Sequence, residues 1–466
     1  MNRLFISAAH KSSGKTTVCI GLCAALRARG EAVQPFKKGP DYIDPLWLAL
    51  AAGRPCYNLD AYLMGADEIR AQVARSMRGA TLGLIEGNKG LYDGLDLHGS
   101  NSNAAMAALL GTPVVLVIDA RGMTRGIAPL ILGYQAFDPS IRIAGVILNQ
   151  LGGSRHEAKL RAVIQHYTGV PVIGAVQHDE RMTIAERHLG LIPSNETQGA
   201  RERVDEIAAH IAGQVDLDPL LAISRQVAPL QGGEPARDAA GGPPVRIGIA
   251  RDAAFGFYYP GDLDALRSAG AELVSFDALH AEHLPPVDGV FIGGGFPETH
   301  MEALAANTSL RRELHDAIEA GLPAYAECGG LMYLARGIEW NGRTAPMVGV
   351  IPADIVMHSR PVGRGYVHLR ETGRGPWPRS PALLIHAHEF HYSSVENLAP
   401  DVEFAYEVER GHGIDGRHDG IVHKNLLASF AHLRDVAGNP WARRFADFVR
   451  SRRHAQTAGL EHRLTP

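Results

Sequence analysis

The sequence predicts an α/β protein made of two α/β domains, the first of them with a mostly parallel sheet. Three observations indicate this fold class. In the first half of the chain, short apolar runs alternate with helix-like patterns, which is typical of a parallel sheet covered by helices. Residues 226–244 are then rich in glycine and proline, as linkers are. The alternation restarts abruptly at Val245, so a second domain begins there.

The apolar runs of the first half are candidate strands. Nearly continuous apolar runs are typical of strands that are buried on both faces, as in parallel sheets. An amphipathic pattern at residues 201–212 predicts a helix that closes this half. The candidate strands are residues 4–8, 32–36, 82–85, 114–118, 142–148 and 172–176.

The second half shows the same signals, followed by a change of character. After Gly337, glycines and short strand-like runs become frequent, so we expect a mixed sheet there. The candidate strands are residues 245–250, 273–276, 289–292, 323–326 and 382–385, and the candidate helices are 261–269 and 309–320. The predicted domain limits are 1–199 for the first domain, 200–244 for the closing helix and interdomain linker, 245–450 for the second domain and 451–466 for a basic tail.

Composition indicates an ordinary soluble enzyme. Hydrophobic residues make up 45% of the 466 residues, charged residues 21%, and the formal net charge is −4. This balance gives no support for a nucleic-acid partner. No apolar run reaches the length of a membrane span, the N-terminus has no signal-peptide core, and the four cysteines form no C-x-x-C pair. We therefore expect a cytoplasmic protein without a nucleic-acid or membrane partner.

The clearest functional motif is AHKSSGKTT, directly after the first candidate strand. Strand, loop and helix in this order are the context of a phosphate-binding P-loop. Gly14 lets the backbone approach a phosphate, and the N–H groups of the loop and of the helix start, up to Thr17, point at the anion. Lys15 adds a positive charge for the outer phosphates, and Thr16 offers a hydroxyl to Mg²⁺. Ala9 stands where such loops usually have their first glycine. The motif predicts a P-loop NTPase domain that binds ATP.

Polar side chains follow three further candidate strands. Asp41 and Asp44 lie three residues apart in a loop and can converge on a cation, while Lys37 can pair with phosphate or carboxylate. Glu86 ends its strand at the usual place of an acidic ligand of Mg²⁺ or water. Asn149 could read an adenine edge or cap the next segment. Because ligands bind outside the carboxyl ends of parallel strands, we favour a site over the alternative of simple turn capping.

Cys328 lies on a tight turn between a candidate strand and a helix-like segment. A helix N-terminus favours the thiolate and leaves N–H groups for an oxyanion. Gly329 follows the thiol directly, and a second strand-end loop offers Gly294 and Gly295, so these glycines are candidates for the oxyanion site. The alternative is a buried structural cysteine, which is the better interpretation of Cys19 and Cys23 on the helix after the P-loop.

At these motifs the sequence resembles the cobyrinic acid a,c-diamide synthase family. The resemblance rests on the P-loop and on the blocks FKKGPDYIDP at 36–45, EGNKGLYDG at 86–94 and ERHLGL at 186–191. It implies a dethiobiotin-synthetase-like amidoligase domain and a flavodoxin-like, triad-type class I glutamine amidotransferase domain. It also implies that Asp41, Asp44 and Glu86 act in catalysis, and that Thr16, Glu86 and Asp44 hold Mg²⁺.

The resemblance also assigns the base of the thiol site. His432 lies in SFAHLR, which matches the family's S-Y-x-H-L-H segment. The carboxylate that a triad places two residues after the histidine is absent, since Arg434 stands there, so we expect a Cys–His pair. A second histidine cluster, HAHEFHY at 386–392, could hold a metal between His386 and His388. The alternative is a family-typical block that shapes the substrate or domain interface.

Together these features imply a two-site enzyme. Glutamine is hydrolysed at Cys328, ATP with Mg²⁺ activates a substrate carboxylate, and ammonia converts it to a carboxamide. The resemblance implies L-glutamine and a tetrapyrrole as substrates, with amidation of the a and c acetate groups of a corrinoid.

The sequence is compatible with other acceptors and with one other class of protein. Local departures at Asn88-Lys89, 99–103 and Arg434 could indicate sirohydrochlorin or sirohaem as the acceptor instead, and hydrogenobyrinate is a further candidate. A partitioning-type P-loop ATPase is the rival of another class, but its second lysine is replaced by His10. A homodimer is also open.

Overall fold

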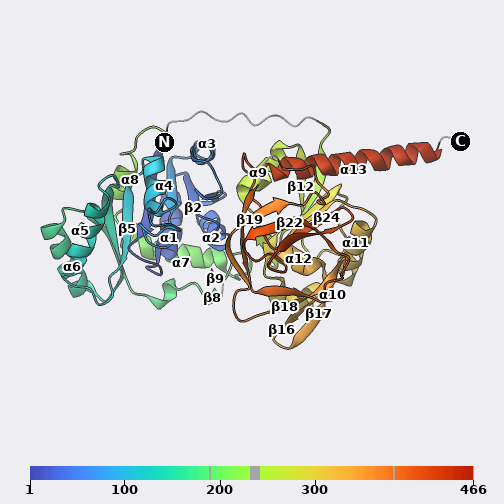
Figure 1. The fold of residues 1–466 in the computed structure, drawn as a ribbon. Coiled ribbons are helices and arrows are strands. Elements are labelled where there is room, and N and C mark those ends of the chain that lie inside the picture. Colours follow the sequence, from blue (N-terminus) through green and yellow to red (C-terminus); the bar gives the residue numbers. More distant parts are fainter. Residues whose placement is uncertain (188–189, 231–241, 381–383, 465–466) are drawn as a thin grey trace. The chain divides into compact units, whose positions relative to one another are not determined.

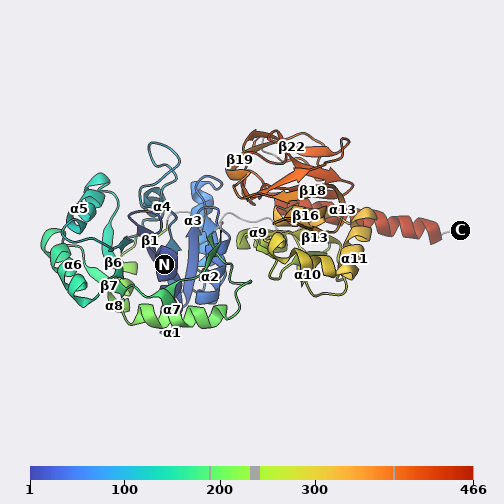
Figure 2. The ribbon, with the colours of Figure 1, turned by 90° about the horizontal axis from the view of Figure 1, so that it is seen from below.

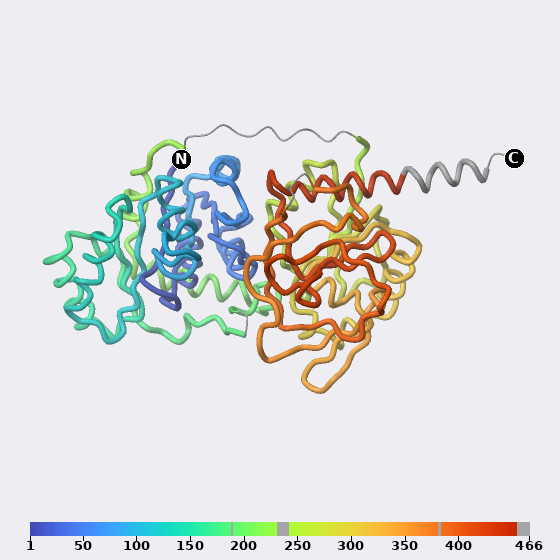
Figure 3. Tube along the Cα trace, in the orientation of Figure 1, coloured from blue at the N-terminus to red at the C-terminus, as the bar shows by residue number. Residues whose placement is uncertain are grey.

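The computed structural model describes residues 1–187, 190–230, 242–380 and 384–464, the last eleven of these by their backbone (Figure 1). The chain divides into two compact units, Met1–Pro235 and Ala236–Pro466. The prediction of two α/β domains is confirmed. Residues outside this description include 188–189 of the block 186–191, the linker residues 231–241, and 382–383 of a predicted strand; Figure 3 draws such residues in grey.

The first unit contains a seven-stranded sheet in the order β3-β2-β4-β1-β5-β6-β7, and every pair in it is parallel. The six predicted strands all form. Strand β3 was not predicted, because its three residues carry no apolar run. The strands are β1 (Asn2–Ala8), β2 (Val33–Lys38), β3 (Tyr57–Leu59), β4 (Leu82–Glu86), β5 (Val114–Asp119), β6 (Ile143–Leu151) and β7 (Val172–Gln177), with a small hairpin of β8 (Glu186–Arg187) and β9 (Gly190–Leu191).

The predicted closing helix is α7, and it packs along α1, as Figure 2 shows. Gly21 makes this close approach possible, because a Cβ there would lie 2.4 Å from Cγ1 of Ile211. The helices of this unit are α1 (Lys15–Ala28), α2 (Ile43–Ala52), α3 (Ala66–Ser76), α4 (Asn103–Leu110), α5 (Ile127–Phe137), α6 (Ser154–Tyr167), α7 (Ala200–Ala212) and α8 (Leu217–Ser224), with a 3₁₀ turn at Glu180–Met182.

The second unit contains a nine-stranded mixed sheet in the order β12-β10-β13-β15-β24-β23-β22-β19-β20. Its first five strands are parallel, and its last four run antiparallel to their neighbours, as predicted for the region after Gly337. The strands of this sheet are β10 (Val245–Ala250), β12 (Ala271–Phe276), β13 (Gly289–Ile292), β15 (Ala324–Glu327), β19 (Gly363–Glu371), β20 (Ile385–His391), β22 (Glu403–Arg410), β23 (His418–His423) and β24 (Leu426–Ser429).

Two smaller sheets and the helices complete the second unit. β11 (Phe255–Phe257) pairs with β14 (Gly294–Gly295), and a four-stranded sheet is built from β16 (Ala335–Trp340), β17 (Arg343–Pro346), β18 (Ile351–Met357) and β21 (Ser393–Glu396). The helices are α9 (Pro260–Ser268), α10 (Met301–Ala306), α11 (Thr308–Glu319), α12 (Gly329–Leu334) and α13 (Trp441–Leu464), with a 3₁₀ turn at Pro297–His300. Among the described residues, no helix is both long and apolar enough to cross a bilayer.

Candidate active sites

The P-loop joins β1 to α1, as its motif predicts. Gly14 caps α1 with a φ of 77°, a left-handed conformation that glycine adopts without strain. A Cβ at this position would lie 2.2 Å from Nδ2 of Asn149, and this same nitrogen donates to the carbonyl of Ser13 at 2.9 Å. Asn149, at the end region of β6, therefore supports the loop, a role that the sequence did not suggest. Lys15 is buried and Thr17 half-buried in the first turn of α1.

The predicted polar residues converge beside the P-loop. The ammonium group of Lys37 lies 2.5 Å from Oδ2 of Asp44, 3.0 Å from Oε1 of Glu86 and 3.7 Å from Oδ2 of Asp41. The hydroxyl of Thr16 donates to Glu86 at 2.6 Å and lies 3.1 Å from Oδ2 of Asp44. The segment that follows β2, the end of β4 and the start of α1 thus meet at one point, which is the arrangement that the sequence predicts.

Electrostatics in this cluster differ from those of isolated side chains. Burial alone would lower the pKa of Lys37, but the charges of Asp44, Glu86 and Asp41 raise it well above its usual value. Burial lowers the pKa of Lys15. Partial burial and the neighbouring Asp44 carboxylate raise the pKa of Asp41 to about 7. Asp41 can therefore exchange a proton near neutral pH.

The donor set of this cluster fits Mg²⁺. Glu86 is fully buried, and its Oε2 has no hydrogen-bond partner among the described residues. With the hydroxyl of Thr16 and the carboxylate of Asp44 it provides hard oxygen donors. No group of three or more His, Cys, Asp or Glu side chains in the described part of the chain could hold a metal by itself. Mg²⁺ usually takes few protein ligands and completes its shell with phosphates and water, so the set suits a nucleotide-bound ion.

The thiol lies on a strained elbow between β15 and α12. Cys328 has φ 47° and ψ −102°, in the left-handed region that non-glycine residues rarely adopt. Its N–H donates to the carbonyl of Ser429 at 2.7 Å. Gly330 permits the turn, because a Cβ there would lie 2.0 Å from the carbonyl oxygen of Ile292. Strained strand-to-helix elbows are a recurrent way to present a nucleophile.

His432 follows β24 and meets the thiol as predicted. Burial by itself would lower the pKa of His432, but hydrogen bonds with the Cys328 thiol and the Glu327 carboxylate raise it to about 10. A Cβ on Gly294 would lie 2.7 Å from Cε1 of His432, so the glycine loop closes against the imidazole. The thiol, its base and this loop therefore form one compact site.

The glycines proposed for the oxyanion site lie together. A Cβ on Gly329 would lie 2.9 Å from the backbone nitrogen of Gly295, so the helix start and the β14 loop are in direct contact. Gly329 is the first residue of α12, where backbone N–H groups have no partner within the helix. The role of Gly294, Gly295 and Gly329 as oxyanion donors stays a prediction.

The expectation of a Cys–His pair without a carboxylate is wrong. Oε2 of Glu327 lies 3.2 Å from Nδ1 of His432, and both side chains are buried. Arg434, at the usual place of the triad carboxylate, turns instead to an ion pair with Asp262 and stacks on the ring of Tyr259. The carboxylate comes from the residue before the nucleophile, which sequence reasoning missed because the spacing differs from that of the usual triad.

The block 386–392 supports the thiol site from a neighbouring strand. His388, in β20, exchanges two backbone hydrogen bonds with His432, at 2.7 and 3.3 Å. Burial and the nearby His432 lower the pKa of His388 to about 3, so its ring is neutral. His391 stacks on Phe430, and His386 on His368. The block therefore fixes the backbone that carries the base; a metal between His386 and His388 stays an alternative.

A side chain at Gly330 should lower the stability of the protein, because the turn leaves no room for it. The variant Gly330→Ala places a methyl group against the Ile292 carbonyl, so we expect the free energy of unfolding to fall by roughly 1–3 kcal/mol. The matched control is Gly438→Ala, because a Cβ there meets no atom within 4 Å. Urea unfolding of both variants measures the difference. Equal stability of the two variants would show that the elbow accommodates the methyl group.

Comparison with known proteins identifies both units. Residues 5–192 match the CobQ/CobB/MinD/ParA nucleotide binding domain, and residues 246–438 match the CobB/CobQ-like glutamine amidotransferase domain. A protein from Magnetococcus marinus named cobyrinate a,c-diamide synthase is 47% identical to this chain, and the match covers 97% of each protein. A protein of the same name from Methanosarcina acetivorans is 43% identical, and that match covers 93% of each protein. A third protein of this name, from Archaeoglobus fulgidus, is 40% identical, and the match covers 95% of this chain and 96% of the relative's length. The chain therefore belongs to the cobyrinate a,c-diamide synthase family.

Proposed function

We propose that this protein is an ATP- and glutamine-dependent carbon–nitrogen ligase that converts the a and c acetate carboxylates of cobyrinate into carboxamides. The observation that carries the proposal is the presence, in one chain, of an acidic cluster beside a P-loop and of a thiol–imidazole–carboxylate site on a strained elbow. The names of its relatives support the choice of acceptor.

The P-loop site activates the carboxylate. A carboxylate is a poor electrophile, so the γ-phosphoryl group of ATP is first transferred to it, which gives an acyl phosphate. The P-loop N–H groups and Lys15 bind the phosphates and stabilise the charge that develops on them. Thr16, Asp44 and Glu86 would hold Mg²⁺, which supplies further positive charge at the outer phosphates. Lys37 keeps the Asp44 and Glu86 carboxylates in place.

Ammonia then attacks the acyl carbon and displaces phosphate. The attacking nitrogen loses a proton as the carbon–nitrogen bond forms. Asp41 is suited to take this proton, because its pKa of about 7 lets it act as a base near neutral pH. The products of this half-reaction are the carboxamide, phosphate and ADP.

The thiol site supplies the ammonia. The Cys328 sulfur attacks the side-chain amide of glutamine while His432 holds the thiol proton, and the glycine loop would stabilise the oxyanion. His432 then donates a proton to the departing ammonia. Water, activated by the same imidazole, hydrolyses the thioester to release glutamate and regenerate the thiol.

Mass spectrometry of acceptors tests the substrate. The protein is incubated with ATP, Mg²⁺, glutamine and, separately, cobyrinate, hydrogenobyrinate and sirohydrochlorin. We expect cobyrinate to gain two carboxamides, each of which lowers the mass by the difference between OH and NH₂. Faster amidation of sirohydrochlorin or hydrogenobyrinate would contradict the choice of acceptor. No amidation of any acceptor, with ATP still hydrolysed, would favour the partitioning-type ATPase. A homodimer and a cytoplasmic location stay predictions.

A further inference from the structure

We propose that Glu327 is the positioning residue of the glutaminase site, a carboxylate that orients His432 from the residue before the nucleophile and is itself held by Tyr325. This inference rests on the proposed function, since it concerns how the thiol site hydrolyses glutamine. Its starting point is the contact of 3.2 Å between Oε2 of Glu327 and Nδ1 of His432.

Both oxygens of the Glu327 carboxylate have a defined partner. Oε2 faces the imidazole, while Oε1 accepts from the hydroxyl of Tyr325 at 2.5 Å and from the N–H of Leu433 at 2.9 Å. Leu433 is the residue next to His432. The Glu327 carboxylate therefore contacts both the His432 ring and the backbone beside it. In parallel pairing, Glu327 at the end of β15 lies opposite Ser429 at the end of β24, which brings the two segments together.

Tyr325 is immobilised by aromatic packing. Its ring stacks on Phe291 at 5.0 Å between centroids and meets the edge of Trp377 at 4.9 Å and the ring of Trp441 at 5.0 Å. Burial and the nearby Glu327 charge raise the pKa of Tyr325 well above its usual value, so its hydroxyl stays a donor. A rigid donor fixes the rotamer of the carboxylate that it binds.

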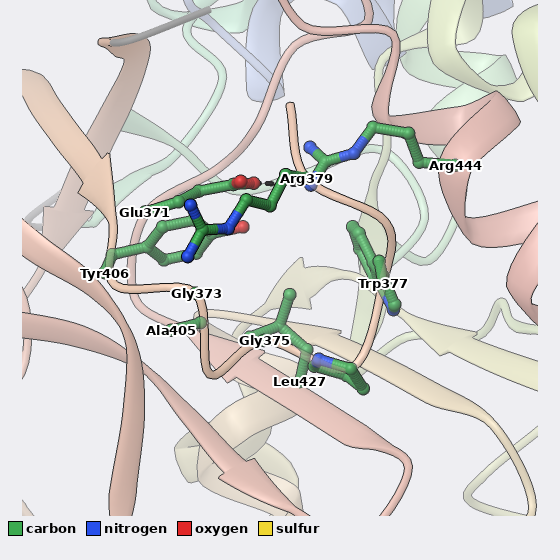
Figure 4. A pocket seen from close by; sticks show the side chains of 10 residues that line it. Glu371, Gly373, Gly375, Trp377, Arg379, Ala405, Tyr406, Leu427 and Arg444 are labelled. Carbon is green, nitrogen blue, oxygen red and sulfur yellow. Dashed lines mark hydrogen bonds and ion pairs between the residues drawn. The ribbon is translucent and has the colours of Figure 1, made fainter. Parts of the chain in front are cut away.

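Trp377 also lines the pocket in Figure 4, together with Glu371 and Arg444. These neighbours hold the loop after β19 that carries Trp377. Trp377 lies in this loop, and Arg444 of α13 donates to the carbonyl of Pro378 at 2.6 Å and forms an ion pair with Glu371. The guanidinium group of Arg444 also lies 6.0 Å from the Trp377 ring. The pocket is thus bordered by the groups that hold Trp377 against Tyr325.

The surroundings of His432 leave Glu327 as its anionic partner. Among the described residues, the ionisable groups that act on the imidazole include Cys328, Glu327 and His388, and the neutral His388 offers no negative charge. Two other buried carboxylates close to this segment have partners of their own: Asp262 forms an ion pair with Arg434, and Asp419 accepts from the backbone N–H groups of Phe430 and Ala431. A carboxylate at Nδ1 orients the ring so that Nε2 faces the thiol, and it stabilises the imidazolium.

The test compares glutamine hydrolysis with ammonium-dependent amidation in the full-length protein. For Glu327→Gln we expect the kcat of glutamine hydrolysis to fall about 10²-fold, with little change in KM and with ammonium-dependent amidation retained. Since Glu327 raises the pKa of His432, the alkaline limb of the kcat/KM profile should also move to lower pH. Glu327→Asp should restore part of the rate.

Two tyrosine variants provide a second test in case Glu327→Gln does not fold. Tyr325→Phe removes only the hydroxyl on Glu327 and should slow hydrolysis, whereas Tyr333→Phe should not, because the Tyr333 hydroxyl has no partner among the described residues. The proposal is overturned if Glu327→Gln hydrolyses glutamine at the wild-type rate. If Glu327→Gln does not fold, a wild-type rate for Tyr325→Phe overturns it. Hydrolysis that survives Cys328→Ala would instead overturn the proposed function itself.

Discussion

Replacement of Cys328 by alanine should abolish glutamine-dependent amidation and leave ammonium-dependent amidation intact. The variant removes the atom that attacks the glutamine amide, and no other thiol can substitute, since Cys19, Cys23 and Cys56 are buried in the first unit. Loss of a covalent nucleophile costs catalysis at least about 10³-fold. Added ammonium bypasses the thiol site and reacts with the acyl phosphate directly. Product mass, with either nitrogen source, measures both activities.

The matched control for this experiment is Cys56→Ala. Cys56 is buried and free but is not part of either site, so both activities should match those of the wild type. Equal glutamine-dependent rates in the Cys328→Ala and Cys56→Ala variants would contradict the assignment of the nucleophile.

Replacement of Lys15 by alanine should abolish amidation with glutamine and with ammonium alike. The P-loop lysine stabilises negative charge on the transferred phosphoryl group, and a cation in this role is worth about 10³-fold or more. Because both nitrogen sources need the same acyl phosphate, neither can bypass the defect. The opposite patterns of the Lys15→Ala and Cys328→Ala variants separate the two half-reactions.

An exposed lysine of the same unit serves as the control. Lys159→Ala, on α6, removes the same charge far from the P-loop in sequence and should leave both activities unchanged. Retention of ammonium-dependent amidation by Lys15→Ala would show that the P-loop does not bind the reacting nucleotide.

The sequence was sufficient to predict six of the seven parallel strands of the first unit and the polar residues that meet beside the P-loop. Buried parallel strands such as β5 are continuous apolar runs, and the residues that end β2 and β4 lie at the same edge of the sheet because both strands are parallel. The observed pairing of β2 with β4 then makes Lys37 and Glu86 neighbours. The short strand β3 has no such pattern and becomes a strand only by pairing with β2.

Contacts between distant segments could not be predicted in the same way. Glu327 reaches His432 because β15 and β24 are neighbours in the sheet, although about a hundred residues separate them in sequence. The sequence signal that could have indicated Glu327 was the presence of a glutamate directly before the candidate nucleophile Cys328. The support that Asn149 gives to the P-loop likewise depends on the pairing of β5 with β6, which no local pattern encodes.

Transfer of oxygen from acceptor to phosphate tests the central claim that this protein activates a carboxylate as an acyl phosphate. Cobyrinate with ¹⁸O in its carboxylates is incubated with ATP, Mg²⁺ and glutamine, and the released phosphate is analysed by mass spectrometry. Because ammonia displaces the phosphate together with one former carboxylate oxygen, each phosphate formed by amidation should carry one ¹⁸O. Amidated product accompanied by unlabelled phosphate would contradict the account.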